Sequence, residues 1–399
     1  MRIILHVDVN NAFLSWTAVE MLKNGSKVDI RNRYAVIGGD EDARRGIVLA
    51  KSNPCKNRGV VTAESLYSAR RKCPYLDVYK GDFKVFRKYS NMMYNYLLQY
   101  SDIIERYSID ECFIDYTGSI RLFGDPVKIA YKIKNDIKNK FGFTVNVGVG
   151  NNKLLAKMAS DFEKPDKVHT LFSNEISTKM WKLSISDLFM VGKSASKKLE
   201  EMGINTIGKL ANYDINILIR KFKSHGKLMW KYANGIDNSE VEYKREDAKS
   251  VSTSTVLPYN YSDKLEIYKV LKVLASNTGK KLRSKNMYAY SVNIWIKYSN
   301  FIKVSKQLSL DNGINSDKDI YHYACNLFDK LWDNDNYIRG LCVGVANISN
   351  NHDAQLTLFN NNYNKDNNYK DDKLQEAMDK IKSKYGDNII TYADMIDKK

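Results

Sequence analysis

The chain has 399 residues, a formal net charge of +17 and a sequence pI near 9.3. This length suits roughly two to four domains, and the charge favours an anionic polymer, most simply nucleic acid, as partner; ribosomes or anionic membrane surfaces would fit the charge alone. No apolar run approaches the ~20 residues that a bilayer span needs, and strand-like sequence begins without a signal peptide before it, so we expect a cytoplasmic protein with no membrane partner.

The cysteines agree with that location. They are Cys55, Cys73, Cys112, Cys325 and Cys342, far apart and without a C-x-x-C pair. This usage predicts reduced thiols and no zinc site.

Short apolar strands and helices alternate in the first part of the chain. Strands are expected over residues 3–7, 34–37, 46–50, 103–104, 109–114 and 144–149, and helices over residues 12–22, 65–73, 86–100, 126–141 and 151–162. Between them, segment 51–58 is polar and basic and is interrupted by Pro54. Because no run of βαβ units is present, we expect an antiparallel or mixed sheet with helices on one face.

Three acidic residues stand beside these strands: Asp8, and the pair Asp110–Glu111 within Tyr-Ser-Ile-Asp-Glu-Cys-Phe-Ile-Asp. Carboxylates beside buried strands need a partner, and divalent cations are a natural one. An Asp near the start and an acidic pair about a hundred residues later predict a two-metal phosphoryl-transfer site. Taken alone, Asp8 also fits a turn or cap residue. Asp110 and Glu111 can share an ion only where their strand bends or ends, because neighbours in a regular strand point to opposite faces.

A helical unit is expected from Val168 onward. Residues 186–195 lead into a helix over 196–202, and the turn 203–208 leads into another helix. Helix, glycine-containing turn, helix is an anion-binding arrangement, and in a chain this basic we expect the anion to be DNA backbone. Plain helix packing explains a single such turn equally well.

A third unit follows the charged segment 238–249, which lacks apolar periodicity and is predicted to be a linker. From Ser250 the expected order is a strand, a helix over 263–284, strands over 290–298 and 301–310, a helix over 317–332 and a strand over 339–348. This order makes a small α/β sandwich with an exposed sheet face. Lysines and an arginine recur along it, which favours a track for a polyanion, although a charged helix face is often only solvated.

The last part of the chain contains one short apolar island. It is Gln355-Leu356-Thr357-Leu358-Phe359, and the Asn-, Asp- and Lys-rich segment 360–373 after it is predicted to be flexible. A final amphipathic segment, 374–385, is predicted to be helical. An exposed peptide with three large apolar side chains needs a pocket on a partner.

Three segments resemble the Y-family of DNA polymerases, and most of all its DNA polymerase IV and UmuC-like branch. They are Ile-Leu-His-Val-Asp-Val-Asn-Asn-Ala-Phe near the start, the Ser-Ile-Asp-Glu hairpin, and Gly-Val-Gly-Asn-Asn-Lys-Leu-Leu-Ala-Lys over 148–157. The resemblance covers roughly residues 1–350, in order and with fitting spacing.

The resemblance implies an α+β protein with the right-hand polymerase architecture. Its parts would be a palm with an antiparallel or mixed sheet (1–17 and 79–166), small fingers (18–78), a helical thumb with helix-hairpin-helix elements (167–237), a linker (238–249), a β-α-β-β-α-β little finger (250–350) and a tail (351–399). The implied activity is DNA-dependent DNA synthesis on primer–template DNA from deoxynucleoside triphosphates. It would be low in fidelity, distributive and translesion in purpose, carried out by a monomer without a proofreading exonuclease.

The same resemblance assigns roles at the site. Asp8, Asp110, Glu111 and the carbonyl of Val9 would hold two Mg²⁺ ions, and Mn²⁺ would be able to replace them. The nucleotide would be bound by backbone N–H groups near Asn10, Asn11, Ala12 and Phe13, and by the side chain of Lys164. Phe13 also matches the family's steric gate, whose ring excludes a ribose 2′-hydroxyl; an ordinary core residue is the alternative. Asp115 and Asp161 match structural acids.

Several positions depart from the family pattern. Asn53 and Lys56 stand where many relatives place Tyr and Arg on the fingers; lysine keeps the charge but loses the bidentate fork, for which Arg58 would compensate. Ile47 and Leu49 alternate on a strand where relatives keep small residues over the nascent base pair. We therefore expect bulky adducts to fit less well than abasic or small lesions.

DNA and clamp contacts complete the expected set. The DNA contacts are Gly192 and Lys193 in the thumb and Lys281, Arg283, Lys297 and Lys303 in the little finger. The clamp contacts are Gln355, Leu356, Leu358 and Phe359, which match the bacterial sliding-clamp-binding peptide Gln-Leu-x-Leu-Phe. A tether of this kind would raise the effective concentration of a distributive enzyme at the primer end; a chance apolar pentamer is the alternative.

Two rival functions remain open. A clamp-associated DNA-binding protein with a silent polymerase site would fit Asn53 and Lys56. A helix-hairpin-helix repair enzyme such as a glycosylase would need a catalytic Lys or Asp beside the hairpin, where Lys193 is the nearest lysine candidate, but it leaves the three acids unexplained.

Overall fold

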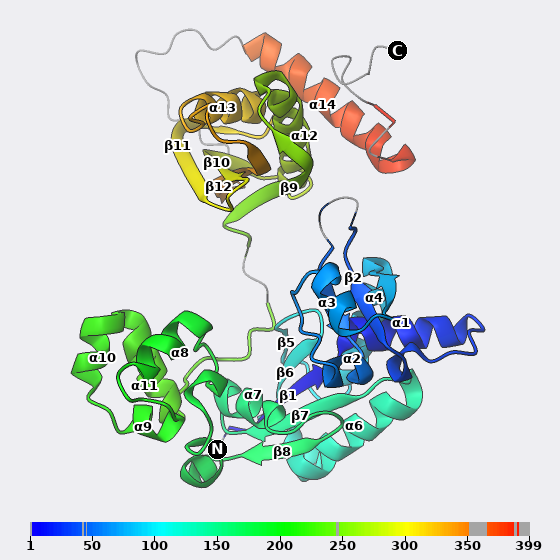
Figure 1. The fold of residues 1–399 in the computed structure, drawn as a ribbon, viewed down its shortest axis with the longest axis vertical. Helices are drawn as coiled ribbons and strands as arrows, with labels where there is room; N and C mark the ends of the chain where they lie inside the picture. The colour runs from blue at the N-terminus through cyan, green and yellow to red at the C-terminus, as the bar shows by residue number, and fades with distance from the viewer. Residues whose placement is uncertain are drawn as a thin grey trace. The chain divides into compact units, whose positions relative to one another are not determined.

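The chain is divided into two compact units in the computed structural model (Figure 1). The structure describes residues 2–41, 44, 46–244, 247–350, 365–386 and 389–390, the side chains of 365–373 excepted. Unit 1 comprises residues 1–40 and 46–245, and unit 2 comprises residues 41–45 and 246–399. Within the described ranges, none of the helices has both the length and the apolar character that crossing a membrane requires.

Unit 1 mixes strands and helices. Its elements are β1 (Ile4–Val9), α1 (Ala12–Lys23), β2 (Ala35–Gly38), β3 (Val48–Lys51), α2 (Asn53–Asn57), α3 (Leu66–Lys72), β4 (Asp77–Lys80), α4 (Phe83–Leu97), β5 (Ile104–Arg106), β6 (Glu111–Asp115), α5 (Ile120–Phe123), α6 (Pro126–Phe141), β7 (Val145–Gly150), α7 (Lys153–Asp161), β8 (Val168–Leu171), α8 (Lys193–Glu200), α9 (Ile207–Ala211), α10 (Ile215–Phe222) and α11 (Ser224–Ala233).

A five-stranded sheet in the order β5-β6-β1-β7-β8 forms the centre of unit 1. All its pairs are antiparallel except β7 with β8, so the prediction of a mixed sheet is confirmed. Helix α7 lies directly against β7: a Cβ at Gly148 would run into the carbonyl of Ala156, and one at Gly150 would lie 2.6 Å from the nitrogen of Ala156. Glycine at these two positions therefore lets α7 approach the sheet, which places the side chains of α7 beside the centre of β1.

Two smaller parts of unit 1 have cores of their own. A three-stranded sheet, β3-β2-β4, packs on α2 and α3 around residues such as Val36, Val48 and Leu66. The side chain of Ser52 caps α2 by accepting the N–H of Cys55, which explains why the polar segment after β3 becomes helical. The four short helices α8–α11 pack around residues such as Leu199 and Leu210.

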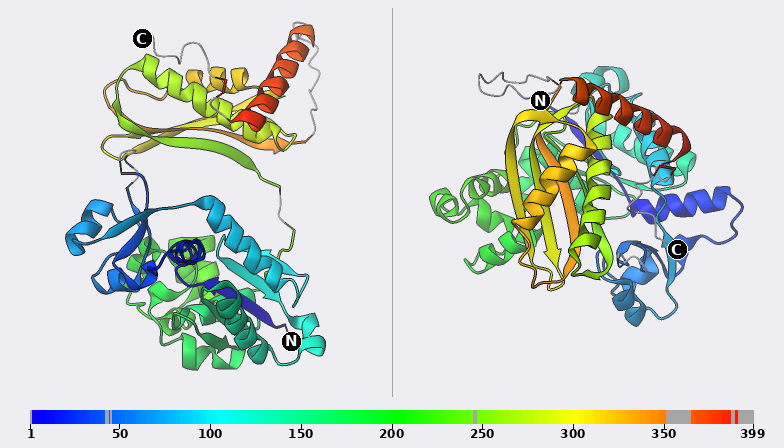
Figure 2. Two further views of the ribbon diagram at one scale, coloured as in Figure 1. Left: turned by 90° about the vertical axis from the view of Figure 1, so that its right-hand side faces the viewer. Right: turned by 90° about the horizontal axis from the view of Figure 1, so that it is seen from above.

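Unit 2 has the predicted β-α-β-β-α-β order. It consists of β9 (Ser250–Tyr261), α12 (Lys264–Arg283), β10 (Tyr288–Tyr298), β11 (Lys303–Ile314), α13 (Asp317–Asp329) and β12 (Ile338–Ser349), followed by α14 (Lys365–Tyr385). The antiparallel sheet has the order β11-β10-β12-β9. Helices α12 and α13 cover one of its faces (Figure 2), and the other is called the open sheet face below. The α+β fold class is thus confirmed.

Candidate active site

Strand β1 carries Asp8 into the centre of the five-stranded sheet. Val7 and Val9 on either side are buried, and Asp8 itself is 6% exposed. Asp8 lies opposite Glu111, the first residue of β6. The N–H of Val9 donates to the carbonyl of Asp110 at 3.1 Å. The sheet therefore brings together the three acids predicted from the sequence, which we call the acidic site.

Asp110 lies in the bend before β6 and not in the strand itself. The hydroxyl of Ser108 donates to Oδ1 of Asp110 at 2.6 Å, and the N–H of Asp110 lies 3.3 Å from the same hydroxyl oxygen. Because β6 begins only at Glu111, Asp110 and Glu111 are not successive residues of one regular strand. Their side chains therefore need not point to opposite faces of the sheet.

Two lysine side chains bind the acidic site. Nζ of Lys164 forms ion pairs with Asp8 and, at 2.8 Å, with Asp161. Nζ of Lys157, which projects from α7, lies 2.7 Å from Oε1 of Glu111. Asp8 and Glu111 thus each have one ammonium partner.

The acidic site is short of positive charge despite these lysines. Burial raises the pKa of Asp8 to about 6 although Lys164 acts against the increase, and the charges of Glu111 and Asp110 add to it. Burial acts to lower the pKa of Lys164, but the carboxylates of Asp8 and Asp161 outweigh it and raise that pKa. A buried carboxylate whose pKa is raised this far is one that a further cation would stabilise.

The donor chemistry of the acidic site suits a hard divalent cation. Three carboxylates supply the oxygen ligands that Mg²⁺ and Mn²⁺ prefer. Among the described residues, the structure contains no group of three or more His, Cys, Asp and Glu side chains arranged to hold a metal ion. In the acidic site, the carboxylates of Asp8 and Glu111 form ion pairs with lysines. The residue types and the raised pKa of Asp8 therefore fit a site for a divalent cation.

The N-terminus of α1 opens directly after β1. Its N-cap residue, Asn11, has a left-handed backbone (φ 50°) and no side-chain cap, and no acidic residue lies in the first turn. The side-chain amide Nδ2 of Asn11 donates to the backbone carbonyl of Lys51 at 2.6 Å. The N–H of Asn10 donates to the carbonyl of Thr144 at 3.0 Å. Because the N–H of Asn10 already has an acceptor, the N–H groups of Ala12 and Phe13 are better placed than that of Asn10 to bind a phosphate.

Phe13 lies at the edge of an aromatic cluster. Its ring stacks on the buried Phe86 at 4.4 Å between centroids and meets Phe83 edge-on at 6.0 Å. The ring is only partly buried, so one side is fixed by packing while part of it remains accessible.

The predicted triphosphate contacts beside the three-stranded sheet lie on α2 or directly after it. Asn53 and Lys56 are exposed on this helix, and the Arg58 guanidinium after it lies 5.7 Å from the ring centroid of Tyr34. Lys51, which the sequence analysis missed, is close by: burial and then the charge of Lys56 lower its pKa. Its Nζ donates to Oγ1 of Thr62 at 3.0 Å.

The two residues expected over the nascent base pair differ in their surroundings. Ile47 pairs with Ser65 in an isolated bridge and is 42% exposed. Leu49, in β3, is half-buried against the core of unit 1. Buried Val48 lies between them, so the two side chains share the less buried side of this segment.

The predicted DNA contacts lie on two separate surfaces. In unit 1, Gly192 is the N-cap of α8 and Lys193 is exposed at its first position. A Cβ at Gly192 would meet nothing within 4 Å, so the backbone there is open to a ligand. In unit 2, Lys281 donates to the carbonyl of Ser252 at 3.1 Å at the edge of the sheet.

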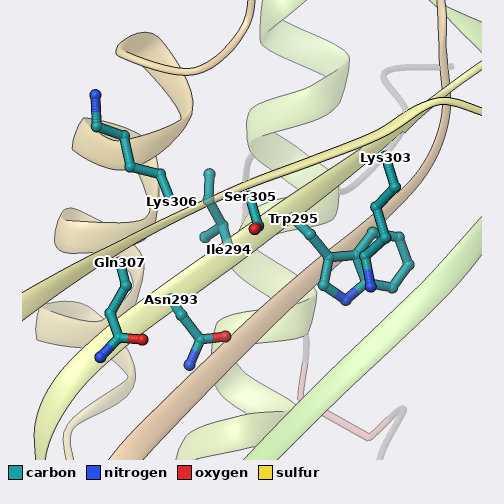
Figure 3. A pocket seen from close by; sticks show the side chains of 7 residues that line it. All are labelled: Asn293, Ile294, Trp295, Lys303, Ser305, Lys306 and Gln307. Carbon is teal, nitrogen blue, oxygen red and sulfur yellow. The ribbon is translucent and has the colours of Figure 1, made fainter. Parts of the chain in front are cut away.

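The open sheet face of unit 2 carries an aromatic ring and two of the predicted lysines. Nζ of Lys303 lies 4.3 Å from the ring centroid of Trp295 (Figure 3), and Nζ of Lys297 lies 4.9 Å from that of Phe301. Asn293, Trp295 and Lys303 line a shallow hollow of about 400 Å³ on this face. Cations beside accessible aromatic rings suit a nucleic-acid backbone and its bases.

Arg283 is a correction to the predicted DNA contacts. Its guanidinium donates to Asp317 at 2.9 Å and to Asp379 of α14 at 2.7 Å, and the side chain is only 13% exposed. Asp317 is itself buried. Arg283 therefore joins α12, α13 and α14, and we withdraw it from the DNA-contact set.

The predicted clamp peptide, Gln355-Leu356-Thr357-Leu358-Phe359, lies outside the described residues. Two lysines inside the described range were missed: Lys51, and Lys157 at the acidic site. Lys157 stands within the Gly-Val-Gly run that carried the family resemblance, four residues after Lys153 on one helix. That spacing was the available signal, because side chains four residues apart share a helix face.

The chain is similar to known proteins over nearly its whole length. The model of the impB/mucB/samB family matches residues 7–161, and the model of that family's C-terminal domain matches residues 248–358. The chain is 47% identical to a DNA polymerase IV of Clostridium acetobutylicum over 100% of this chain and 99% of that protein. It is 34% identical to a DNA polymerase IV of Acetivibrio thermocellus, over 96% of this chain and 95% of that protein.

Solved structures give the same result for the fold. A Y-family DNA polymerase chimera of Dbh and Dpo4 superposes with a TM-score of 0.75 at 24% identity, covering 88% of this chain and 100% of the chimera. A Dbh ternary complex superposes with a TM-score of 0.59 at 25% identity, covering 87% of this chain and 99% of that chain.

Proposed function

Since the chain belongs to the Y-family of DNA polymerases, in its DNA polymerase IV branch, and is a DNA-directed DNA polymerase, we propose that Asp8, Asp110 and Glu111 are its catalytic, metal-binding residues. The observation that carries the proposal is the register of β1 with β6, which sets buried Asp8 opposite Glu111 and beside the Asp110 bend. The proposed reaction joins a deoxynucleotide to a primer 3′-end in low-fidelity, distributive translesion synthesis. Family membership removes the glycosylase alternative.

The residues of the acidic site have separate tasks in this proposal. The carboxylates and the carbonyl of Val9 would hold two Mg²⁺ ions, which when bound lower the pKa of the primer 3′-hydroxyl and stabilise the leaving pyrophosphate. Lys164 keeps its proton because its pKa is raised by Asp8 and Asp161. It can therefore bind a triphosphate oxygen as a cation.

The start of α1 would orient the triphosphate and the sugar. Uncapped N–H groups at Ala12 and Phe13 point out of a helix N-terminus, which favours phosphate. The Phe13 ring, held from behind by Phe86, would then exclude a ribose 2′-hydroxyl. Because Phe86 is buried, the ring has no room to retreat from the added oxygen.

Cations near α2 would bind the outer phosphates. Lys56 and Arg58 are exposed beside Asn53, and Lys51 adds a charge that the sequence analysis did not include. Two lysines together would supply the charge that the Tyr and Arg of many relatives provide, without the geometry of a bidentate fork.

Lesion choice would follow from Ile47 and Leu49. If these side chains roof the nascent base pair, a bulky guanine adduct should be bypassed poorly and an abasic site well. Single-nucleotide insertion on three templates that differ only in this base measures the preference. Equal efficiency opposite the bulky adduct and opposite undamaged guanine would exclude the roof.

DNA would be held by the exposed Gly192–Lys193 start of α8 and by the open sheet face with Lys297 and Lys303, with Lys281 at the sheet edge. The ternary complex with Dbh is the comparison that supports primer–template DNA and a nucleotide as ligands. We propose further that the chain acts as a cytoplasmic monomer without a proofreading exonuclease.

The clamp-binding role of Gln355, Leu356, Leu358 and Phe359 rests on the sequence motif. A peptide of this kind would tether unit 2 to a sliding clamp and raise the local concentration of the enzyme at the primer end. Its test is clamp stimulation of primer extension, described with the predictions below.

Single-nucleotide primer extension with Mg²⁺ tests the catalytic assignment. The wild-type protein should incorporate on undamaged and abasic templates, and Asp110→Ala should not. The matched control is Asp115→Asn at the opposite end of β6, where the carboxylate only accepts the N–H of Thr117 at 3.0 Å. Incorporation by Asp110→Ala at the wild-type rate would refute the assignment. No incorporation by the wild-type protein, with normal DNA binding, would equally refute a catalytic role for the three acids.

A further inference from the structure

Helix α7 presents two lysines that form matched ion pairs. Nζ of Lys157 lies 2.7 Å from Glu111, and Nζ of Lys153, one turn earlier, lies 2.7 Å from Glu105. All four side chains are 11–17% exposed. The pairs differ in place and in their other partners: Glu111 belongs to the acidic site, whereas Glu105 lies on the neighbouring strand β5 and also accepts the N–H of Glu242 at 2.8 Å. Lys153 donates in addition to the carbonyl of Glu240 at 3.3 Å.

The Lys157 ammonium is fixed in its place from several sides. Its Nζ lies 5.5 Å from the ring centroid of Phe189 and 5.7 Å from that of Tyr107. The whole residue is 9% exposed. A lysine confined in this way loses little additional freedom when it holds one carboxylate in one orientation.

A fixed ammonium at this position has two electrostatic consequences. It holds the carboxylate of Glu111 in one orientation through the 2.7 Å ion pair. It also repels a divalent cation that approaches the same carboxylate, because at this distance and burial the repulsion is only partly screened. The ammonium of Lys157 that orients the Glu111 carboxylate therefore also lowers the affinity of the site for the divalent cation.

We propose that Lys157 is a positioning residue: it holds the carboxylate of Glu111 in one orientation for the divalent cation, and its charge weakens the binding of that cation. The inference rests on the proposed metal-binding role of the acidic site. It assigns a role to a side chain that neither binds metal nor touches the reacting atoms.

Binding of Mn²⁺ alone, followed by the loss of the free-ion electron paramagnetic resonance signal, tests the proposal without turnover. Lys157→Met should bind Mn²⁺ about tenfold more tightly than the wild-type protein, which corresponds to about 1.4 kcal/mol. Lys157→Gln should behave in the same way and provides a second charge-removing variant if Met disturbs the fold. Lys157→Arg should restore the wild-type affinity, because it restores the charge.

The matched control is Lys153→Met. It removes an ammonium of equal burial from the same helix, so a loss of stability comparable to that of Lys157→Met is expected in thermal unfolding. Its Mn²⁺ affinity should equal that of the wild-type protein. Equal affinity in Lys157→Met, Lys157→Gln and the wild-type protein would overturn the proposal, and so would an equal tightening in Lys153→Met.

Asp8→Asn separates this failure from failure of the metal site itself. If the wild-type protein binds Mn²⁺ and Asp8→Asn does not, the site stands, and only the Lys157 comparison decides the proposal. If Asp8→Asn binds Mn²⁺ as tightly as the wild-type protein, the metal-binding assignment is wrong, and the role of Lys157 is overturned with it.

Discussion

Replacing Asp8 by Asn should stabilise the metal-free protein while removing its activity. The carboxyl of Asp8 has an ordinary pKa of 3.8, which burial raises to about 6 in the folded protein. The folded state therefore prefers the neutral form, and asparagine imitates that form with nearly the same shape. The net increase already includes the opposing attraction of Lys164.

The magnitude follows from the pKa difference. An increase of about 2.2 in pKa, at about 1.4 kcal/mol for each pKa unit, corresponds to about 3 kcal/mol. Because the folded-state pKa is raised, the favourable contribution of neutral Asp8 is fully present below pH 3.8 and is lost as the pH rises through about 6. The gain from Asp8→Asn should be near zero at pH 3.8 or below and should approach about 3 kcal/mol above pH 7.

Urea unfolding in EDTA, at several pH values from 3.5 to 8, measures the difference between the two proteins. Titrating groups that do not interact with Asp8 cancel in this difference. Asp166→Asn is the control of opposite sign: burial acts to raise the pKa of Asp166, but its ion pairs with Lys134 and Lys138 prevail and lower it. That variant should therefore be less stable than the wild-type protein at neutral pH, and the deficit should shrink as the pH falls through the lowered pKa. A pH-independent difference for Asp8→Asn, or destabilisation at pH 8, would refute the reasoning.

Three further predictions concern other parts of the chain. Phe13→Ala should raise ribonucleotide insertion relative to deoxynucleotide insertion by at least about tenfold, measured by single-turnover insertion; unchanged sugar selectivity would show that Phe13 serves packing alone. Arg283→Met should destabilise unit 2 by about 3–5 kcal/mol in urea unfolding, because it removes the guanidinium that lies 2.9 Å from the buried Asp317; a loss below about 1 kcal/mol would contradict the buried ion pair. Replacing Leu358 and Phe359 with Ala should leave basal primer extension intact and remove its stimulation by a bacterial sliding clamp, and full stimulation of that variant would exclude this segment as the docking site.

The sequence predicted those features of the fold that depend on local pattern. The apolar residues of β1 and the Ser-Ile-Asp-Glu run indicated two buried strands with acids at their ends, and the structure pairs them with Asp8 opposite Glu111. The β-α-β-β-α-β order of unit 2 also follows from local periodicity, and the structure confirms it. The helical segment α2 was not predicted, because its five residues, Asn-Pro-Cys-Lys-Asn, are too few and too polar to show an apolar helical periodicity.

Charged side chains were harder to predict because their roles depend on distant partners. Arg283 and Lys281 are two residues apart on one helix, and a charge count treats them alike. Asp317 and Asp379 turn Arg283 into an internal ion-pair residue, whereas Lys281 stays exposed at the sheet edge. The sign of a side chain's charge can be read from the sequence. The carboxylates that neutralise Arg283, however, come from segments 34 and 96 residues away.

The same reasoning explains why the acids were found and one of their lysines was assigned no role. An acid beside an apolar strand is conspicuous in a sequence, whereas a lysine on an amphipathic helix is not. Yet the acidic site depends on both, because Lys164 and Lys157 compensate part of the charge of Asp8 and Glu111. Gly148 and Gly150 let α7 approach β7 closely enough to deliver Lys157. The glycines of the Gly-Val-Gly run and the lysine at its end thus act together: close backbone packing places a cation next to Glu111, a carboxylate of the acidic site.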